Sequence, residues 1–217
     1  MRIFTNKKAL LIAGIILIGG VSFGIHANSK QADAAPAQKI NLYEATNLTS
    51  LDASKITDAV SSSQLGQVDE GLYRLNKDSK PVNALATKTT ISKNGKIYTI
   101  NLRHNGRWSD GKKVTAHDFV YSWERTLNPK TKSEFTYLFA SIKNANAIMI
   151  GKKAPRTLGV KATNKYQLKI TLSKPVPYFK KLLAGTTFYP ISQKAVEKYG
   201  NKYGTSAKKT VYNGPFV

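Results

Sequence analysis

Hydrophobic and polar residues follow two different periods along the chain, and each period predicts its own kind of element. Apolar and polar side chains alternate in steps of two over 39–44, 97–103 and 166–172, which is typical of half-buried strands. A short strand is also expected at 158–160. Apolar residues recur at helical spacing over 56–72, 115–127, 135–150, 175–183 and 191–199. Short strands mixed with short helices favour an α/β or α+β fold.

Turn residues mark several element boundaries. Asn94-Gly95 is a strong hairpin signal, and Trp108-Ser109-Asp110-Gly111 predicts a tight turn. Thr115 and Asp118 have the spacing of a capping box, with Asp in place of the usual Glu, so a helix is expected to begin there. Asn128-Pro129 predicts its end.

The first 34 residues have the layout of a targeting segment rather than of a fold. Basic residues precede an apolar run over 9–25 in which Ser22 is the only polar residue, and small residues follow at 32–34. This pattern is typical of a secretory signal peptide. The run is close to the minimum length for a membrane span, so an uncleaved N-terminal anchor is the alternative. Both readings predict an exported protein at the cell surface or outside the cell.

Composition narrows the chemistry. The chain of 217 residues contains no Cys, which excludes disulfides, thiolate metal sites, a Cys nucleophile and a lipid-bearing Cys anchor. Its net charge is +22, and residues 126–217 hold 17 Lys and Arg against 2 Asp and Glu. The lysines alternate with apolar residues, as in 165–170. We therefore expect a solvated basic sheet face, or affinity for anionic cell-wall polymers, and no nucleic-acid partner.

No constellation for catalysis or metal binding stands out. His26, His104 and His117 lack ligand spacing, and Asp69-Glu70 are adjacent and therefore point to different sides of a helix. The sequence has neither a Gly-x-Ser-x-Gly motif nor a phosphate-cradling glycine loop. We expect no catalytic residues, no metal and no cofactor. Among the aromatic residues, Trp123 is expected in the core, whereas Phe135 and Tyr137 fit a cleft wall as well as a core.

Several motifs carry a resemblance to a known family. The run LRHNGRWSDGKKVTAHDFVYSWER over 102–125 strongly resembles the oligopeptide-binding proteins of ABC importers, extracellular solute-binding protein family 5. Shorter matching motifs follow the family's order at 47–52, 70–74, 158–162, 173–179, 195–200 and 213–216. The resemblance covers roughly residues 39–217.

The resemblance implies a periplasmic-binding-protein-like type II architecture, in which two hinged lobes close over an extended peptide held by backbone hydrogen bonds. Family members are much longer. By comparison with the family, 39–69 and 192–217 would form part of lobe I, 70–191 would form an inserted subdomain, and the second lobe would be absent. The chain would then be a fragment, a truncated product or half of a split gene, and we expect it to bind peptides weakly on its own.

The family's peptide-facing positions fall on Thr57, Asp58 and Ala59, and on an aromatic matched by Phe135 with Tyr137 close by. The family often has Tyr there, so Phe135 would lack its hydroxyl bond. The implied function is capture of short peptides, by a monomer, for an ABC permease in the membrane. A pheromone peptide or nickel as solute, a wall-adhering surface protein and a secreted hydrolase are alternatives. The few His residues disfavour nickel, and the missing nucleophile disfavours a hydrolase.

Overall fold

The computed structural model describes residues 43, 44 and 46–216. The targeting segment at 1–34 and most of the strand predicted at 39–44 lie outside the described residues. The strands are β1 Tyr73–Leu75, β2 Pro81–Asn83, β3 Ala86–Ile91, β4 Ile97–Leu102, β5 Val160–Asn164 and β6 Gln167–Thr171. The α-helices are α1 Ala59–Val68, α2 Ala116–Leu127, α3 Ala145–Met149, α4 Phe179–Leu182 and α5 Gln193–Tyr199. No helix in this described part is long and apolar enough to span a membrane.

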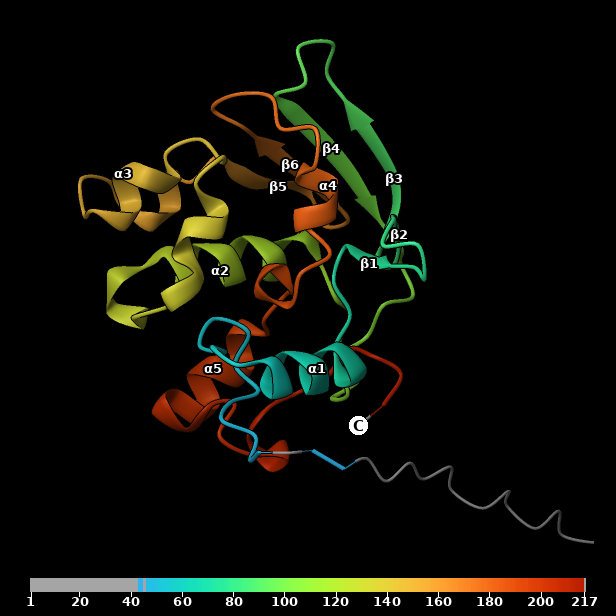
Figure 1. Ribbon diagram of the computed structural model, residues 1–217, viewed down its shortest axis with the longest axis vertical. Helices are drawn as coiled ribbons and strands as arrows, with labels where there is room; N and C mark the ends of the chain where they lie inside the picture. Colours follow the sequence, from blue (N-terminus) through green and yellow to red (C-terminus); the bar gives the residue numbers. More distant parts are fainter. Residues whose placement is uncertain (1–42, 45, 217) are drawn as a thin grey trace, which may run out of the picture. The chain divides into compact units, whose positions relative to one another are not determined.

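An antiparallel sheet of four strands, in the order β3-β4-β6-β5, is the centre of the larger hydrophobic core (Figure 1). Tyr98, Ile100 and Leu102 of β4 are buried, and so are Leu168 and Ile170 of β6. Side chains alternate between the two faces of a strand, so these residues all point to one face, where α2 and α4 pack. The other face carries the intervening polar residues. The alternation predicted for β4 and β6 is confirmed.

The predicted hairpin at Asn94-Gly95 joins β3 to β4. Gly95 has φ +67°, a left-handed conformation that Gly adopts without steric cost, and its N–H donates to the carbonyl of Ser92 at 2.8 Å. The Asn94 side-chain oxygen accepts from the N–H of Lys96 at 3.1 Å. The turn chemistry therefore fixes the register of the two strands locally.

Helix α2 begins and ends where the sequence predicts. The Asp118 carboxylate accepts from the Thr115 N–H at 2.7 Å, which supports the first turn of the helix. Phe119, Trp123 and Leu127 are buried, and the Trp123 ring is packed edge-on against aromatic neighbours. Asn128 follows as the C-cap residue. The core role expected for Trp123 is confirmed.

The single helix predicted over 135–150 is wrong. A 3-10 helix, η2 (Glu134–Phe139), and the short α3 take its place. Between them, Ile142 pairs with Leu172 in an isolated antiparallel bridge and Asn144 adopts φ +69°. The bridge and the positive φ both require a backbone conformation that a continuous helix does not have. The regular spacing of apolar residues arises because 135–150 buries one side against the core, although the segment is not one helix.

Three other predicted helices are shorter than expected. Asp58 caps α1 and Ser192 caps α5, so these helices begin at 59 and 193 rather than at 56 and 191. α1 ends at Val68, before the buried Asp69 and Glu70. Only 179–182 is α-helical in the segment 175–183, which contains two prolines. Proline lacks the N–H that a helix interior needs.

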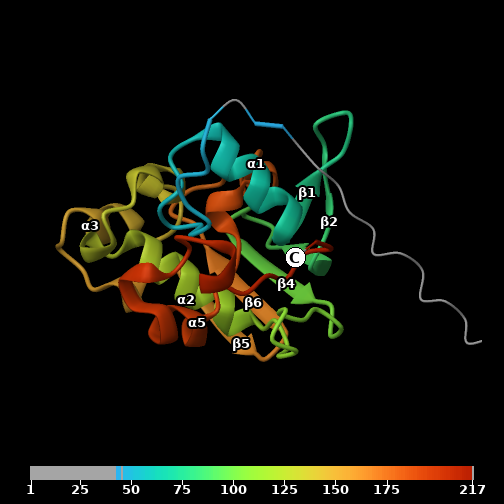
Figure 2. The ribbon, with the colours of Figure 1, turned by 90° about the horizontal axis from the view of Figure 1, so that it is seen from below.

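Two hydrophobic cores share the described part of the chain. The larger is built from residues between Leu72 and Phe188. The smaller combines two segments far apart in sequence; its buried members are Leu51, Ala53, Ile56, Leu65, Tyr189, Ile191, Ala195, Tyr203 and Tyr212. In Figure 2, seen from below, α1 and α5 both lie on the viewer's side of the β4-β6-β5 sheet.

An ion pair links the two cores. Both oxygens of Asp52 accept from the Arg125 guanidinium at 2.7 Å, and Asp52 is only 1% exposed. The Arg125 guanidinium also lies 5.8 Å from the centre of the Tyr203 ring, in cation–π geometry. Beside this pair, the hydroxyls of Ser54 and Thr126 bond at 2.8 Å. Helix α2 is thus bonded to Asp52, the last residue of the 47–52 motif, and to Ser54 just after it.

Asn213 fastens the end of the described chain to the point where the larger core begins. Its side-chain amide exchanges two 2.9 Å hydrogen bonds with the backbone of Glu70, and its N–H donates to Asp69 at 2.9 Å. Next to this clamp, Gly71 lies against the Tyr189 ring so closely that a Cβ would come within 2.5 Å of it. The chain passes from the smaller core to the larger near Gly71 and returns near Tyr189, and these two crossings lie side by side.

We predict that Arg125→Ala lowers the free energy of unfolding by about 3–5 kcal/mol, because Asp52 would keep a buried charge without its partner. Urea unfolding followed by circular dichroism measures the change. Lys112→Ala is the matched control, since its ion pair with Asp110 is exposed and should contribute within about 1 kcal/mol. Equal losses in the two variants would contradict the role of the buried pair.

We predict that Asp69→Asn removes a pH dependence of stability. Burial raises the pKa of the Asp69 carboxyl from 3.8 to about 7. Between these values the folded chain keeps a proton that the unfolded chain has lost, so this group's contribution to stability declines as pH rises from about 4 to about 7. Thermal unfolding of both proteins across this range should show the variant gaining on the original chain. A constant difference would refute the prediction.

Candidate functional site

Thr57, Asp58 and Ala59 lie at the N-terminus of α1. Thr57 and Ala59 are exposed, as a ligand-facing role requires. Asp58 is the N-cap of the helix: its carboxylate accepts from the Ser61 N–H at 2.7 Å and from the Thr49 hydroxyl. These bonds, the Ser61 N–H foremost, hold the pKa of Asp58 below its usual value. Its carboxylate is therefore engaged within the protein.

The segment before α1 is held by the same helix turn. The Ser61 hydroxyl accepts from the N–H groups of Thr49 and Ser50, at 3.1 and 3.2 Å, and lies 2.9 Å from the Thr49 hydroxyl. Ser61 itself is fully buried. These hydrogen bonds hold residues 49 and 50 against the first turn of α1, next to which Thr57 lies in sequence.

Phe135 and Tyr137 lie in η2, and the structure brings their rings together. The ring centres are 6.1 Å apart in an edge-to-face arrangement. Tyr137 is 61% exposed, whereas Phe135 is half-buried. Phe135 is the residue matched to the family's aromatic position, but its neighbour Tyr137 is the more exposed of the two.

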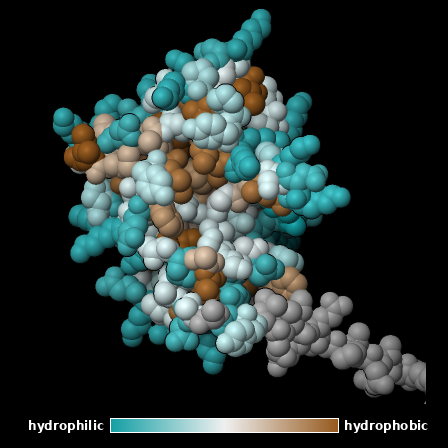
Figure 3. Space-filling view, in the orientation of Figure 1, coloured by the Kyte–Doolittle hydropathy of each residue, from teal (hydrophilic) through white to brown (hydrophobic). Residues whose placement is uncertain are grey.

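Two adjoining hollows share Leu138, Tyr178 and Leu182, and Tyr137 lines the first of them. The first, of about 350 Å³, is lined by Tyr137, Leu138, Ala140, Ser141, Asn146, Lys174, Val176, Tyr178 and Leu182. The second, of about 460 Å³, is lined by Leu75, Leu138, Tyr178, Lys181, Leu182, Ala184, Gly185 and Phe188. We call the two together the apolar hollow. Figure 3 shows apolar side chains gathered on this face, near α4.

A short 3-10 helix, η4 (Thr186–Phe188), connects the apolar hollow to α1. The Thr186 hydroxyl lies 2.8 Å from the Ser62 hydroxyl of α1, and Phe188 lines the hollow. η4 therefore lies between α1, which starts at Ala59, and the apolar hollow that Tyr137 borders.

The apolar hollow combines aromatic walls, aliphatic residues and two lysines. Tyr178 is 63% exposed and Leu75 is 45% exposed, which is unusual for side chains of this size grouped together. Such a surface can accept apolar side chains of a ligand, with the tyrosine hydroxyls and lysines as polar contacts. The sequence analysis did not single out Tyr178, Leu75, Leu138 or Leu182, because the hydrophobic pattern does not reveal which large apolar side chains remain accessible at a hollow.

Histidine and carboxylate side chains do not form a metal-binding group in the described part of the chain. His104 stacks on Tyr166 with ring centres 4.2 Å apart. Glu70 is bound by both Arg74 and Arg103, the latter at 2.5 Å. The charged groups that sequence analysis considered for chemistry are thus mostly engaged in structural contacts.

Comparison with known proteins finds similar bacterial solute-binding and peptide-binding proteins. The profile of bacterial extracellular solute-binding proteins, family 5 Middle, matches residues 80–217. A dipeptide-binding protein of Lactococcus lactis subsp. cremoris is 43% identical over 216 residues, covering 100% of this chain and 38% of that protein. The periplasmic oligopeptide-binding protein OppA of Salmonella typhimurium is 38% identical over 215 residues, covering 97% and 39%. The structure of Listeria monocytogenes OppA bound to peptide matches with a TM-score of 0.78 at 43% identity, covering 79% of this chain and 34% of that chain.

The chain belongs to the family 5 bacterial extracellular solute-binding proteins. The resemblance in the sequence motifs and the mixed α/β fold of this class are confirmed. The chain spans about two fifths of the length of the curated relatives it matches, at 38% and 39%.

We predict that Asp58→Ala lowers the melting temperature of the chain more than Asp58→Asn does, because Asn keeps a side-chain acceptor for the Ser61 N–H. The advantage of Asp over Asn should shrink as pH falls below about 3.8, because the unfolded chain takes up a proton there while the folded carboxylate, whose pKa is lower, takes it up only at still lower pH. Far-ultraviolet circular dichroism melts test both statements. Identical melting of the Ala and Asn variants would show that the cap does not stabilise α1.

Proposed function

We propose that this chain forms one wall of the peptide-binding site of an ABC importer's extracellular solute-binding component. The single observation that carries the proposal is the apolar hollow, with Tyr137 and Tyr178 exposed on its walls. Relatives at 38–43% identity carry the names dipeptide-binding and oligopeptide-binding protein, which supports the same ligand class. The component captures and delivers peptides and has no catalytic role.

The proposed binding mode gives separate roles to the start of α1 and to the apolar hollow. Thr57 and Ala59, exposed at the rigid start of α1, offer a place for backbone hydrogen bonds to an extended peptide. The apolar hollow takes its side chains. Because the hollow is wide and open, with volumes of about 350 and 460 Å³ in its two parts, it suits varied side chains rather than one.

We further propose the lobe assignment. The smaller core, which joins residues 51–65 to 189–212, supports treating 39–69 and 192–217 as part of one lobe. The larger core, within 72–188, supports an inserted subdomain over 70–191. A second lobe is proposed to supply the other half of the peptide's backbone partners, and an ABC permease is the proposed receiver. Export of the chain and its action as a monomer belong to the same proposal.

Ligand-observed NMR with a pool of tetra- to hexapeptides tests the function. We predict saturation transfer to peptide protons in the full chain and its loss in the double variant Tyr137→Ala/Tyr178→Ala, since the variant removes the two aromatic walls of the hollow. Ile91→Ala is the control, because Ile91 is also an exposed large apolar residue but lies on β3. Equal signals in both variants would contradict the assigned site.

Calorimetry with the same pool tests the strength of binding. One wall provides only part of the backbone partners, so weak binding is expected for this chain by itself. Clear micromolar binding would show that the described surface suffices without a second lobe. Binding that persists at high salt would favour peptide capture over wall adhesion, because adhesion through lysines is screened by salt.

A further inference from the structure

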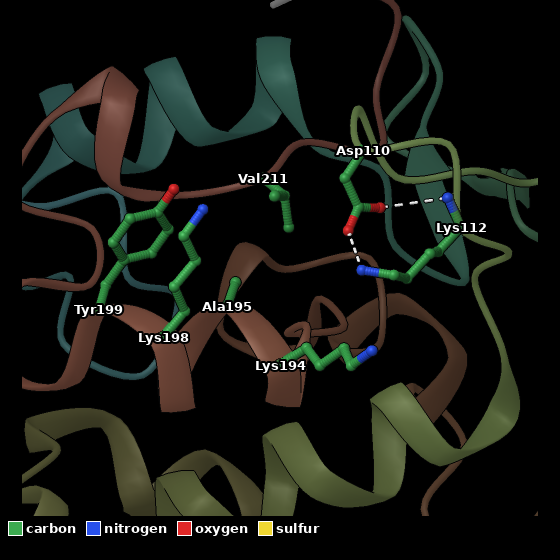
Figure 4. Close-up of a pocket in the computed structure, with 7 residues that line it drawn as sticks. All are labelled: Asp110, Lys112, Lys194, Ala195, Lys198, Tyr199 and Val211. Carbon is green, nitrogen blue, oxygen red and sulfur yellow. Dashed lines mark hydrogen bonds and ion pairs between the residues drawn. The ribbon is translucent and has the colours of Figure 1, made fainter.

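A separate hollow of about 420 Å³ lies beside α5, and none of its lining residues belongs to the apolar hollow (Figure 4). Its residues come from the tight turn at 108–111 with the next residue, from α5 and from the segment after it. They are Asp110, Lys112, Lys194, Ala195, Lys198, Tyr199 and Val211. We call this the basic hollow.

The basic hollow has a surplus of positive charge. Lys194 and Lys198 are four residues apart on α5, so both side chains start from the same side of the helix. In Figure 4 the Lys198 ammonium lies on the Tyr199 side of the hollow, and Lys194 extends toward the side of Lys112. Lys112 approaches from the opposite wall, as Figure 4 shows. Three lysines and one carboxylate thus border one concave space, and a bound anion would balance the remaining positive charge.

The nearby carboxylates balance this charge only in part. Asp110 is engaged by Lys112, through the ammonium at 2.5 Å and the backbone N–H at 3.1 Å. Glu197 accepts from the Gln193 side chain at 2.8 Å and does not line the hollow. Among the described residues, no carboxylate lies within ion-pair distance of Lys194 or Lys198.

The floor of the basic hollow is apolar. Ala195 and Val211 form its centre in Figure 4, and the Tyr199 ring stands at one side with the Lys198 ammonium 5.0 Å from the ring centre. A bare anion would occupy only part of a space of about 420 Å³. A ligand that joins a charged group to a small carbon unit would use both the lysines and the floor.

We propose that the basic hollow binds the phosphate group of a phosphodiester polymer whose repeats are small polyols. Lysine is a common phosphate ligand because its compact ammonium carries three donors, and Lys194 and Lys198, which form no ion pair among the described residues, suit an anion with several acceptor oxygens. The excess of basic residues over 126–217 attracts such a polymer from solution.

A membrane surface fits this hollow less well. Proteins that lie on a bilayer insert large apolar side chains among the lipids. None of the exposed large apolar residues of the described chain lines the basic hollow. The concave shape and small apolar floor favour a single polymer strand over a flat layer of headgroups.

Isothermal titration of the full chain with poly(glycerol phosphate) and with glycerol 3-phosphate, at low ionic strength, tests the proposal. The double variant Lys194→Gln/Lys198→Gln should bind the polymer roughly tenfold more weakly or worse, because two charge-assisted contacts are lost. The matched control is Lys152→Gln/Lys208→Gln, which removes the same charge from exposed positions outside the hollow. Its affinity should stay near that of the original chain.

Each outcome of the titration either supports or overturns the proposal. Selective loss in the Lys194/Lys198 variant supports it, whether or not the monomeric phosphate also binds, since a polymer gains affinity from repeated sites. Equal weakening in both double variants would overturn it and show that overall charge attracts the polymer. Absence of polymer binding would overturn it, and so would lysine-dependent binding confined to phosphatidylglycerol vesicles. Unchanged thermal melts establish that both variants are folded.

Discussion

The ion pair between Asp52 and Arg125 is the contact on which the arrangement of the described chain depends. It joins a turn of the smaller core to a helix of the larger one, with two hydrogen bonds of 2.7 Å in a nearly water-free place. A buried charge is costly unless it is paired. The two cores are therefore held in one orientation that keeps this pair closed, and α1 and η4 keep their places beside the apolar hollow.

The apolar hollow shows how a rigid scaffold can hold apolar side chains in water. Tyr178 precedes α4, whose Phe179 is fully buried against Tyr98 of the sheet. Similarly, Tyr137 precedes Phe139, which is buried against Trp123. In both places one aromatic anchors the backbone and its near neighbour remains exposed. The exposed surface is thus stabilised by the core directly beneath it, without being buried itself.

Sequence alone predicted the features that depend on neighbouring residues. The Asn94-Gly95 hairpin and the Thr115–Asp118 cap require only local chemistry, and both are present in the structure. The helix expected over 135–150 failed because the bridge from Ile142 reaches a segment thirty residues away. The partner of Arg125 could not be predicted for the same reason. Tyr137 was a candidate from the family motif, but the hollow around it depends on tertiary packing.

The contact between Gly71 and Tyr189 has a topological consequence. The backbone leaves the smaller core at one of these residues and returns at the other, so the two ends of the intervening segment lie side by side. Its interior is bonded to the smaller core as well, through Arg125 and Thr126. Segments whose two ends meet can be inserted, removed or exchanged with little disturbance to their host. An exchanged segment would therefore have to keep a cation in the place of Arg125, because the buried Asp52 carboxylate of the host needs its partner.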